Sequence, residues 1–412
     1  MINADAVEQL EESAENDITP TGQPQDGRPM RGSSFPVRVR AQLSSLFVRA
    51  EDWAFDSKKA LYGFAIVRII SGVTILGFLA TNFSTRYYSY GSGSAWSAEG
   101  VIPVSAFSTM PIFDIVHRFA YNDLAFSALY GLLAVLAVLL IVGYRFRLVL
   151  PALFVLWVGL LEQTSLFGDM SDNLSRIVLF FLFFTGAADV WSLDARRRRR
   201  WAHGGSSAWF MRVVRNQPVL PPWIPNLVHN AALAMLIYQI CLVYFTGGFY
   251  KLAGESWREG IAVWYPLQVS VFSTFPEITG PLLNWGPLVA AATLGTVLVQ
   301  IWFPWMLLNR WSRILALVVI MVFHVAIGIL MGLFWFSLWM VALDAVLIRD
   351  VSYQRLARWV SHAVRRTPRR EPKDQQPGPR RTGLEEPTTP PKVTDQARRA
   401  AEEPSFAPLH HA

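Results

Sequence analysis

A short stretch near the middle of the chain combines an amine with small residues at helical spacing. Tyr244, Gly247, Gly248 and Lys251 fall on one face of a helix, because residues separated by three, four or seven positions share a face. The two glycines remove side-chain bulk, so a second helix or a flat ligand can lie against the backbone beside the amine. The sequence therefore predicts that Lys251 stands beside an open helix surface.

Lys251 ends an apolar run that begins near His229, which places its charge at the edge of a membrane span. A lysine at mid-bilayer costs roughly 3 kcal/mol on insertion scales, so its presence needs a reason. One reason is structural: the side chain snorkels to the headgroups or pairs with Glu255 at i+4. The other is chemical: burial favours the neutral amine, which is a base. Position alone leaves both open.

Two further polar residues lie inside apolar runs. Arg68, a third of the way through the first run, is explained by pairing with a carboxylate or with helix-end carbonyls that lock a bundle, and a ligand contact is the alternative. His324 lies near the middle of the seventh run, where a hydrogen-bonded packing role and a site role are both open. Gln239 and Gln300 are explained by hydrogen bonds between helices.

The composition is that of a polytopic membrane protein. Hydrophobic residues make up 52% of the 412 residues and charged residues 16%, against roughly 25% charged residues in soluble domains. The apolar runs cover about 61–80, 124–142, 148–161, 174–188, 230–250, 287–308, 315–330 and a last run that ends near Ile348. The pattern predicts an all-α transmembrane helical bundle of about eight spans.

Other classes of protein are disfavoured. The net charge of +7 comes from basic residues beside apolar runs and in the tails, so we expect no nucleic-acid partner. The single Cys241 excludes an internal disulfide and a cysteine-based metal site. The seven histidines are scattered, and we expect no metal.

The polar segments divide the chain further. Residues 1–35 and 367–412 are rich in proline and charge and are expected to be disordered tails. Residues 36–57 are expected to form an amphipathic surface helix and residues 351–366 a basic one. The bundle then occupies residues 58–350.

The distribution of basic residues predicts the orientation. The connections 143–147, 189–228 and 309–313 are rich in arginine, whereas 162–173 and 331–333 contain no lysine or arginine. By the positive-inside rule the basic connections and both termini lie in the cytoplasm. Lys251 and Trp257 then lie at the outer face. The run Arg196–Arg200 is most simply an orientation signal that touches anionic lipid.

Several segments together resemble the transmembrane region of vitamin K-dependent gamma-carboxylase, known in bacteria as the HTTM (horizontally transferred transmembrane) domain. They span about residues 55–350. The segments are Val67-Arg68-Ile69, Trp191 to Asp194, Tyr244-Phe245-x-x-Gly248-x-x-Lys251-Leu252, Trp257-x-x-Gly260, Phe323-His324 and the turn Gly332–Phe334.

The resemblance implies a gamma-carboxylase-like enzyme in a bacterial inner membrane, with a reduced quinone such as menaquinol as cofactor. In the family carboxylase, the lysine that matches Lys251 deprotonates the quinol. Lys251 and His324 are the implied catalytic residues, and the implied cofactor-binding residues are Arg68, Tyr244, Gly247, Gly248 and Trp257. In place of the carboxylase's large luminal domain we expect only a short polar tail after the bundle. A peptide or small molecule at the outer face is therefore the expected substrate, and membrane lipids are the other expected partners.

Two other functions fit the same sequence. A non-catalytic membrane component could serve the processing, export or immunity of a partner. A transporter would be marked by inverted repeats and broken helices, and no repeat is evident. Whether Lys251, His324 and Arg68 meet at one cavity distinguishes the enzyme from the non-catalytic component.

Overall fold

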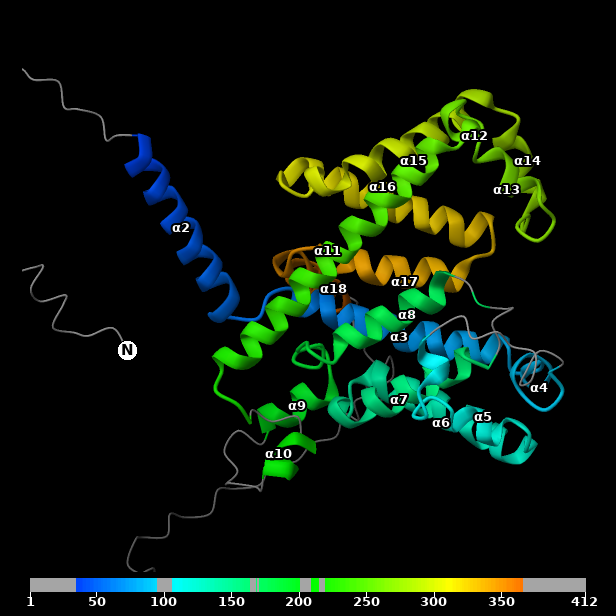
Figure 1. Cartoon of the computed structure of the whole chain (residues 1–412), viewed down its shortest axis with the longest axis horizontal. Coiled ribbons are helices and arrows are strands. Elements are labelled where there is room, and N and C mark those ends of the chain that lie inside the picture. Colours follow the sequence, from blue (N-terminus) through cyan, green and yellow to red (C-terminus); the bar gives the residue numbers. More distant parts are fainter. Residues whose placement is uncertain are drawn as a thin grey trace, which may run out of the picture. The chain divides into compact units, whose positions relative to one another are not determined.

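A computed structural model of the chain describes residues 35–94, 106–163, 168, 170–200, 209–214 and 219–365 (Figure 1). All regular structure in these residues is helical, which confirms the predicted all-α fold. The chain divides into two compact units, residues 1–359 and 360–412. The first contains all the helices discussed below except the end of α18.

The predicted apolar runs correspond to eight helices. They are α3 (Leu61–Thr81), α6 (Asp123–Val142), α7 (Phe146–Leu161), α8 (Met170–Leu182), α11 (Trp223–Ala253), α15 (Gly286–Met306), α16 (Arg310–Leu330) and α17 (Phe334–Ala345). Helices α3, α6, α11, α15 and α16 are long and apolar enough to cross a membrane, whereas α7 and α17 are apolar but shorter. The chain is therefore a multi-pass membrane protein.

Further helices connect these eight or precede and follow them. They are α2 (Phe35–Phe55), α4 (Arg86–Tyr90), η1 (Ala106–Thr109), α5 (Ile115–Ala120), α9 (Leu193–Arg200), α10 (Trp209–Val214), α12 (Glu255–Arg258), α13 (Trp264–Gln268), α14 (Pro276–Leu283) and α18 (Asp350–Arg365). Helices α12, α13 and α14 form the connection between α11 and α15, next to the site described below.

The long helices pack as a continuous series of neighbours. Helix α11 packs on α15, α15 on α16, α16 on α17, α17 on α3, and α3 on α6 (Figure 1). Helix α8 contacts α3, α7 and α17. On α15 and α16 many large apolar side chains stay exposed, among them Leu298, Trp302, Val318 and Val322. Such a surface is unfavourable in water and matches contact with lipid chains.

Helix α8 ends at Leu182, before the predicted end of its run at 188, because a buried histidine binds the chain there. The backbone N–H of Gly186 donates to Nδ1 of His229 at 2.8 Å, and Nε2 of His229 lies 2.6 Å from the carbonyl oxygen of Lys59. His229 and Asn230 are both fully buried. The imidazole thus ties the segment after α8 and the segment before α3 to the first half of α11.

The N-terminus of α3 is capped from the far end of the sequence. Both oxygens of the Asp350 carboxylate accept backbone N–H groups, from Leu61 at 3.1 Å and from Tyr62 at 3.0 Å. A carboxylate at a helix N-terminus satisfies free N–H groups and complements the helix dipole. The start of α18 is thereby fixed to the start of α3.

Candidate functional site

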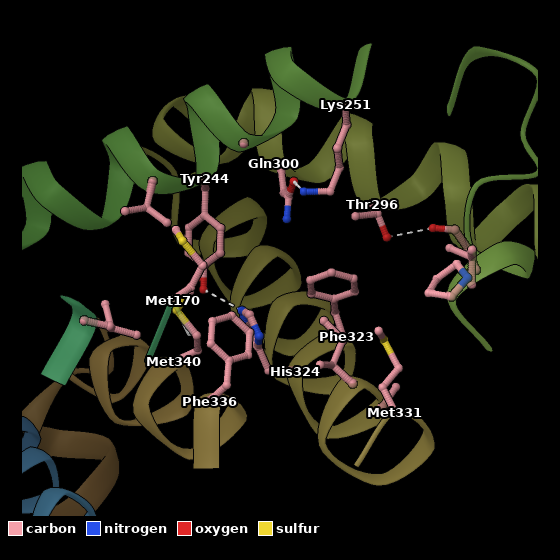
Figure 2. A pocket seen from close by; sticks show the side chains of 18 of the residues that line it. Met170, Tyr244, Lys251, Thr296, Gln300, Phe323, His324, Met331, Phe336 and Met340 are labelled. Atoms are coloured by element: carbon pink, nitrogen blue, oxygen red, sulfur yellow. Dashed lines mark hydrogen bonds between the residues drawn. The ribbon is translucent and has the colours of Figure 1, made fainter. Parts of the chain in front are cut away.

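A cavity of about 550 Å³ lies between α8, α11, α15, α16 and α17. Its walls include Met170, Asn173, Tyr244, Gly247, Lys251, Trp257, Thr296, Gln300, Phe323, His324, Ala326, Met331, Phe336 and Met340 (Figure 2). The volume lies within the range of small-molecule sites, and the walls are mostly apolar with a few convergent polar groups, as in such sites. We call it the Lys251 cavity.

The amine of Lys251 is directed into the structure. Its Nζ donates a hydrogen bond to Oε1 of Gln300 at 3.0 Å and lies 5.3 Å from the centre of the Trp257 ring. Among the described residues Lys251 forms no ion pair with Glu255, so the pairing offered by their i+4 spacing is not found. Gln300, from α15, holds the amine in the cavity wall.

Two of the cavity-lining residues belong to a buried set of hydrogen-bonded side chains from three helices. The Tyr244 hydroxyl, on α11, lies 3.1 Å from Nε2 of His324, on α16. The same hydroxyl donates to the carboxylate of Asp344, on α17, at 2.8 Å and 2.9 Å. All three side chains are at least 98% buried. Figure 2 shows two separate contacts, one between Tyr244 and His324 and the other between Lys251 and Gln300.

Which atoms donate and which accept among Tyr244, His324 and Asp344 follows from counting protons. The phenol of Tyr244 has one proton, and it goes to Asp344, so Nε2 of His324 donates to the phenol oxygen. Nδ1 of His324 is then an acceptor. It is buried and has no hydrogen-bond partner among the described residues. His324 contributes to the cavity wall, whereas this nitrogen itself is buried away from the open space.

The glycines on the face of α11 serve two different surfaces. Gly247 lines the cavity, and a methyl group there would lie 3.8 Å from both Nζ of Lys251 and Oε1 of Gln300. Gly248 packs against α15, where an added Cβ would lie 2.7 Å from Cγ1 of Ile301. Gly248 therefore does not line the cavity, and it sets the close approach of two helices.

Arg68 lies away from the Lys251 cavity, near the ends of α3, α6 and α8 that carry the basic connections. Its fully buried guanidinium donates to backbone carbonyls of Leu140 at 2.6 Å, Ala187 at 3.0 Å and Trp191 at 2.7 Å, and also to that of Ile141. These carbonyls follow α8 or end α6. These contacts match the structural role predicted for Arg68, in which its guanidinium binds helix-end carbonyls. Arg68 does not meet Lys251 and His324 at one cavity.

The fragment from α3 to the segment before α11 matches a known family: residues 64–221 fit the sequence model of the HTTM domain. This part of the chain is therefore similar to the HTTM domain. The match contains Arg68 and the α8 wall of the Lys251 cavity, and it ends before α11. Comparison with curated proteins and with solved structures gave no match.

The region similar to the HTTM domain thus supplies one wall of the cavity, and the polar side chains of the other walls come from residues after it. Tyr244, Lys251, Trp257 and His324, which were predicted as site residues, line the cavity together with Gly247. Gln300 was interpreted as a helix-to-helix hydrogen bond, and it makes one, but with Lys251 as its partner.

Asp344 was missed in the sequence. It lies in the apolar run Leu343–Asp344–Ala345. Its side chain is completely buried and does not line the Lys251 cavity. A carboxylate inside an apolar helix is a functional-site signal in its own right, and applying that rule to the eighth run would have found it. Its pairing with Tyr244 could not be read from spacing, because 100 positions separate the two residues.

Proposed function

We propose that this protein is an integral membrane enzyme that binds a quinol-like molecule in the Lys251 cavity and uses the Lys251 amine as a base. The observation that carries the proposal is that Lys251 and His324, two polar side chains that are costly in a membrane, line one apolar cavity of about 550 Å³.

The residues of the cavity fit a flat apolar ring that carries hydroxyl groups. Phe323, Phe336 and Tyr244 provide aromatic walls, and Lys251 and Gln300 place an amine and an amide in the wall. When bound, a quinol would supply oxygen-dependent redox chemistry, which is the chemistry implied by the resemblance to gamma-carboxylase. No group of three or more His, Cys, Asp or Glu side chains that could hold a metal occurs in the described residues.

Lys251 is suited to accept a proton at Nζ. In its neutral form the amine has a lone pair that takes the proton of a ligand hydroxyl, and the C–N bond vector is fixed by the contact with Gln300. The ammonium that forms donates to Oε1 of Gln300 and lies near the face of Trp257, both of which stabilise a cation. The site therefore favours proton uptake without a carboxylate that would hold the amine permanently charged.

The cavity lies toward the end of the bundle that we assign to the outer side of the cell membrane. It is lined by residues from Met170 to Ile177 on α8, by the second half of α11 from Gln239 onward and by the second half of α16, whereas the basic connection 309–313 joins the other end of α16. A peptide or small molecule arriving from outside would meet this end. The assignment rests on the positive-inside rule.

The test compares wild type, Lys251→Ala and the control Lys59→Ala, each purified in detergent. Lys59 is a second lysine at a helix end, but its amine donates to Ser57 and does not line the cavity. We expect oxygen-dependent consumption of menaquinol by wild type and by the control, and its loss in a Lys251→Ala variant that unfolds at the same temperature. Equal consumption by all three, or no quinone in lipid extracts of wild type, would instead support the non-catalytic role.

A further inference from the structure

A second cavity, of about 610 Å³, lies at the end of the bundle where α3 begins and α6 ends. Its walls include Tyr62, Val142, Trp191, Leu193, Arg196 and Arg199. We call it the arginine cavity. It shares no lining residue with the Lys251 cavity, so its role is independent of the proposed enzyme function.

The arginines of α9 differ in their partners. Arg198 pairs with Asp189 at 3.0 Å, and Arg197 lies 4.0 Å from the buried carboxylate of Asp194. Arg196 and Arg199 are exposed, share a helix face at i+3, and line the cavity. Within the described residues their guanidinium groups have no carboxylate partner. The cavity thus carries two positive charges that the protein leaves uncompensated.

The aromatic wall of this cavity has a strained backbone, which a buried charge holds in place. Trp191 has a left-handed backbone, with φ of 48°, a conformation that is strained for a residue other than glycine. Its carbonyl accepts a hydrogen bond from the buried Arg68 at 2.7 Å. Its indole packs edge-on against the Tyr62 ring at 5.1 Å, yet remains 45% exposed. A large indole is therefore fixed beside the two arginines.

We propose that the arginine cavity binds the phosphate of an anionic phospholipid. The guanidinium groups of Arg196 and Arg199 donate to the phosphate oxygens, for which the guanidinium geometry is suited. Tyr62, Trp191 and Val142 contact the glycerol and the first methylenes of the acyl chains, as interfacial aromatic residues do. A lipid is favoured over a soluble phosphate because Tyr62, Val142 and Trp191 give the wall an apolar part that borders the ends of membrane-spanning helices.

The test is native mass spectrometry of the full-length protein, released from a neutral detergent and titrated with dioleoyl phosphatidylglycerol. The informative variant is Arg196→Gln/Arg199→Gln. The matched control is Arg200→Gln/Arg310→Gln, which removes the same charge from exposed arginines that do not line the cavity. Trp191→Leu removes the aromatic wall without changing the charge.

We expect wild type to retain one phosphatidylglycerol and to prefer it to phosphatidylcholine. Retention should fall by about tenfold or more in Arg196→Gln/Arg199→Gln, because two charge-assisted hydrogen bonds are lost, and it should fall in Trp191→Leu but stay unchanged in the control. Retention that stays unchanged in Arg196→Gln/Arg199→Gln would overturn the proposal. Equal loss in both double variants would show that only the general charge of the surface matters, and would overturn it too. So would displacement of the lipid by an equal concentration of inorganic phosphate.

Discussion

Nζ of Lys251 donates to Oε1 of Gln300 across 3.0 Å and so joins α11 to α15 in the wall of the cavity. Gln300 is 95% buried, and its neutral amide holds the amine without fixing the charge on it. This pairing turns Lys251 inward, whereas a lysine at a helix end would otherwise extend to the headgroups. The identity of residue 300 should therefore control both the position and the protonation of the amine.

Gln300→Glu should lower menaquinol oxidation at neutral pH more than Gln300→Leu does. A carboxylate at this distance favours the protonated amine, which cannot accept a proton. Activity of Gln300→Glu should return as the pH rises and the amine loses its proton, so its pH profile shifts to the alkaline side. The control is Gln239→Glu, which adds a carboxylate to the same cavity at a position that does not bond to Lys251. Identical pH profiles for both Glu variants would contradict the role of Gln300.

Tyr244→Phe should destabilise the protein, and Asp344→Asn should recover part of the loss. Removing the phenol oxygen leaves the Asp344 carboxylate and Nε2 of His324 buried without their partner, at a cost of about 1–3 kcal/mol or more. An unpaired amide costs less to bury than an unpaired carboxylate, so the double variant should unfold at a higher temperature than Tyr244→Phe alone. Thermal unfolding in detergent measures this. Additive effects of the two substitutions would show that the residues do not form a unit.

Gly248→Ala should separate α11 from α15. An added Cβ would lie 2.7 Å from Cγ1 of Ile301 and 3.0 Å from its backbone nitrogen, and overpacking of this kind costs about 1–3 kcal/mol. The matched control is Gly295→Ala on α15, where a Cβ meets nothing within 4 Å. There alanine should be neutral or stabilising by about 0.5–1 kcal/mol. A Gly248→Ala variant as stable as Gly295→Ala would show that the interface adjusts at little cost.

The helices could be predicted from the sequence because hydropathy acts locally. Each apolar run from Leu61 to Ala345 forms a helix, since the backbone must satisfy its own hydrogen bonds in lipid. Lengths were less predictable: α8 ends at Leu182 because Gly186 bonds to His229, a contact across 43 positions. Local patterns contain no information about such a partner.

The candidate site was predictable to the extent that it rests on one helix face. Tyr244, Gly247 and Lys251 share the cavity because the helical period places them together. Arg68 was grouped with them through the family resemblance, although its position in an apolar run equally predicted the lock that the structure contains. Because burying a charge is costly, an arginine in an apolar run must have a partner. The sequence does not reveal whether that partner is a carbonyl or a ligand.

Arg68→Lys should lower stability and leave the Lys251 cavity unchanged. A lysine has three donors at a single nitrogen and cannot reach all four carbonyls that the guanidinium binds. With hydrogen bonds to a charged group lost, we expect a cost of about 3 kcal/mol. The quinone retained per folded molecule, measured in lipid extracts, should equal that of wild type. Loss of retained quinone from a folded Arg68→Lys variant would restore Arg68 as a cofactor-binding residue.

Ala326→Trp should block the Lys251 cavity without disturbing the membrane-facing surface of α16. Ala326 lines the cavity, and an indole there occupies the space beside His324 and Phe323. Val322, on the same helix, is 62% exposed and does not line the cavity, so Val322→Trp is the matched control. We expect retained quinone and menaquinol oxidation to disappear in Ala326→Trp and to persist in Val322→Trp, with both variants folded. If Ala326→Trp kept its quinone, the ligand would have to bind elsewhere in the bundle, and Lys251 would lose its proposed substrate.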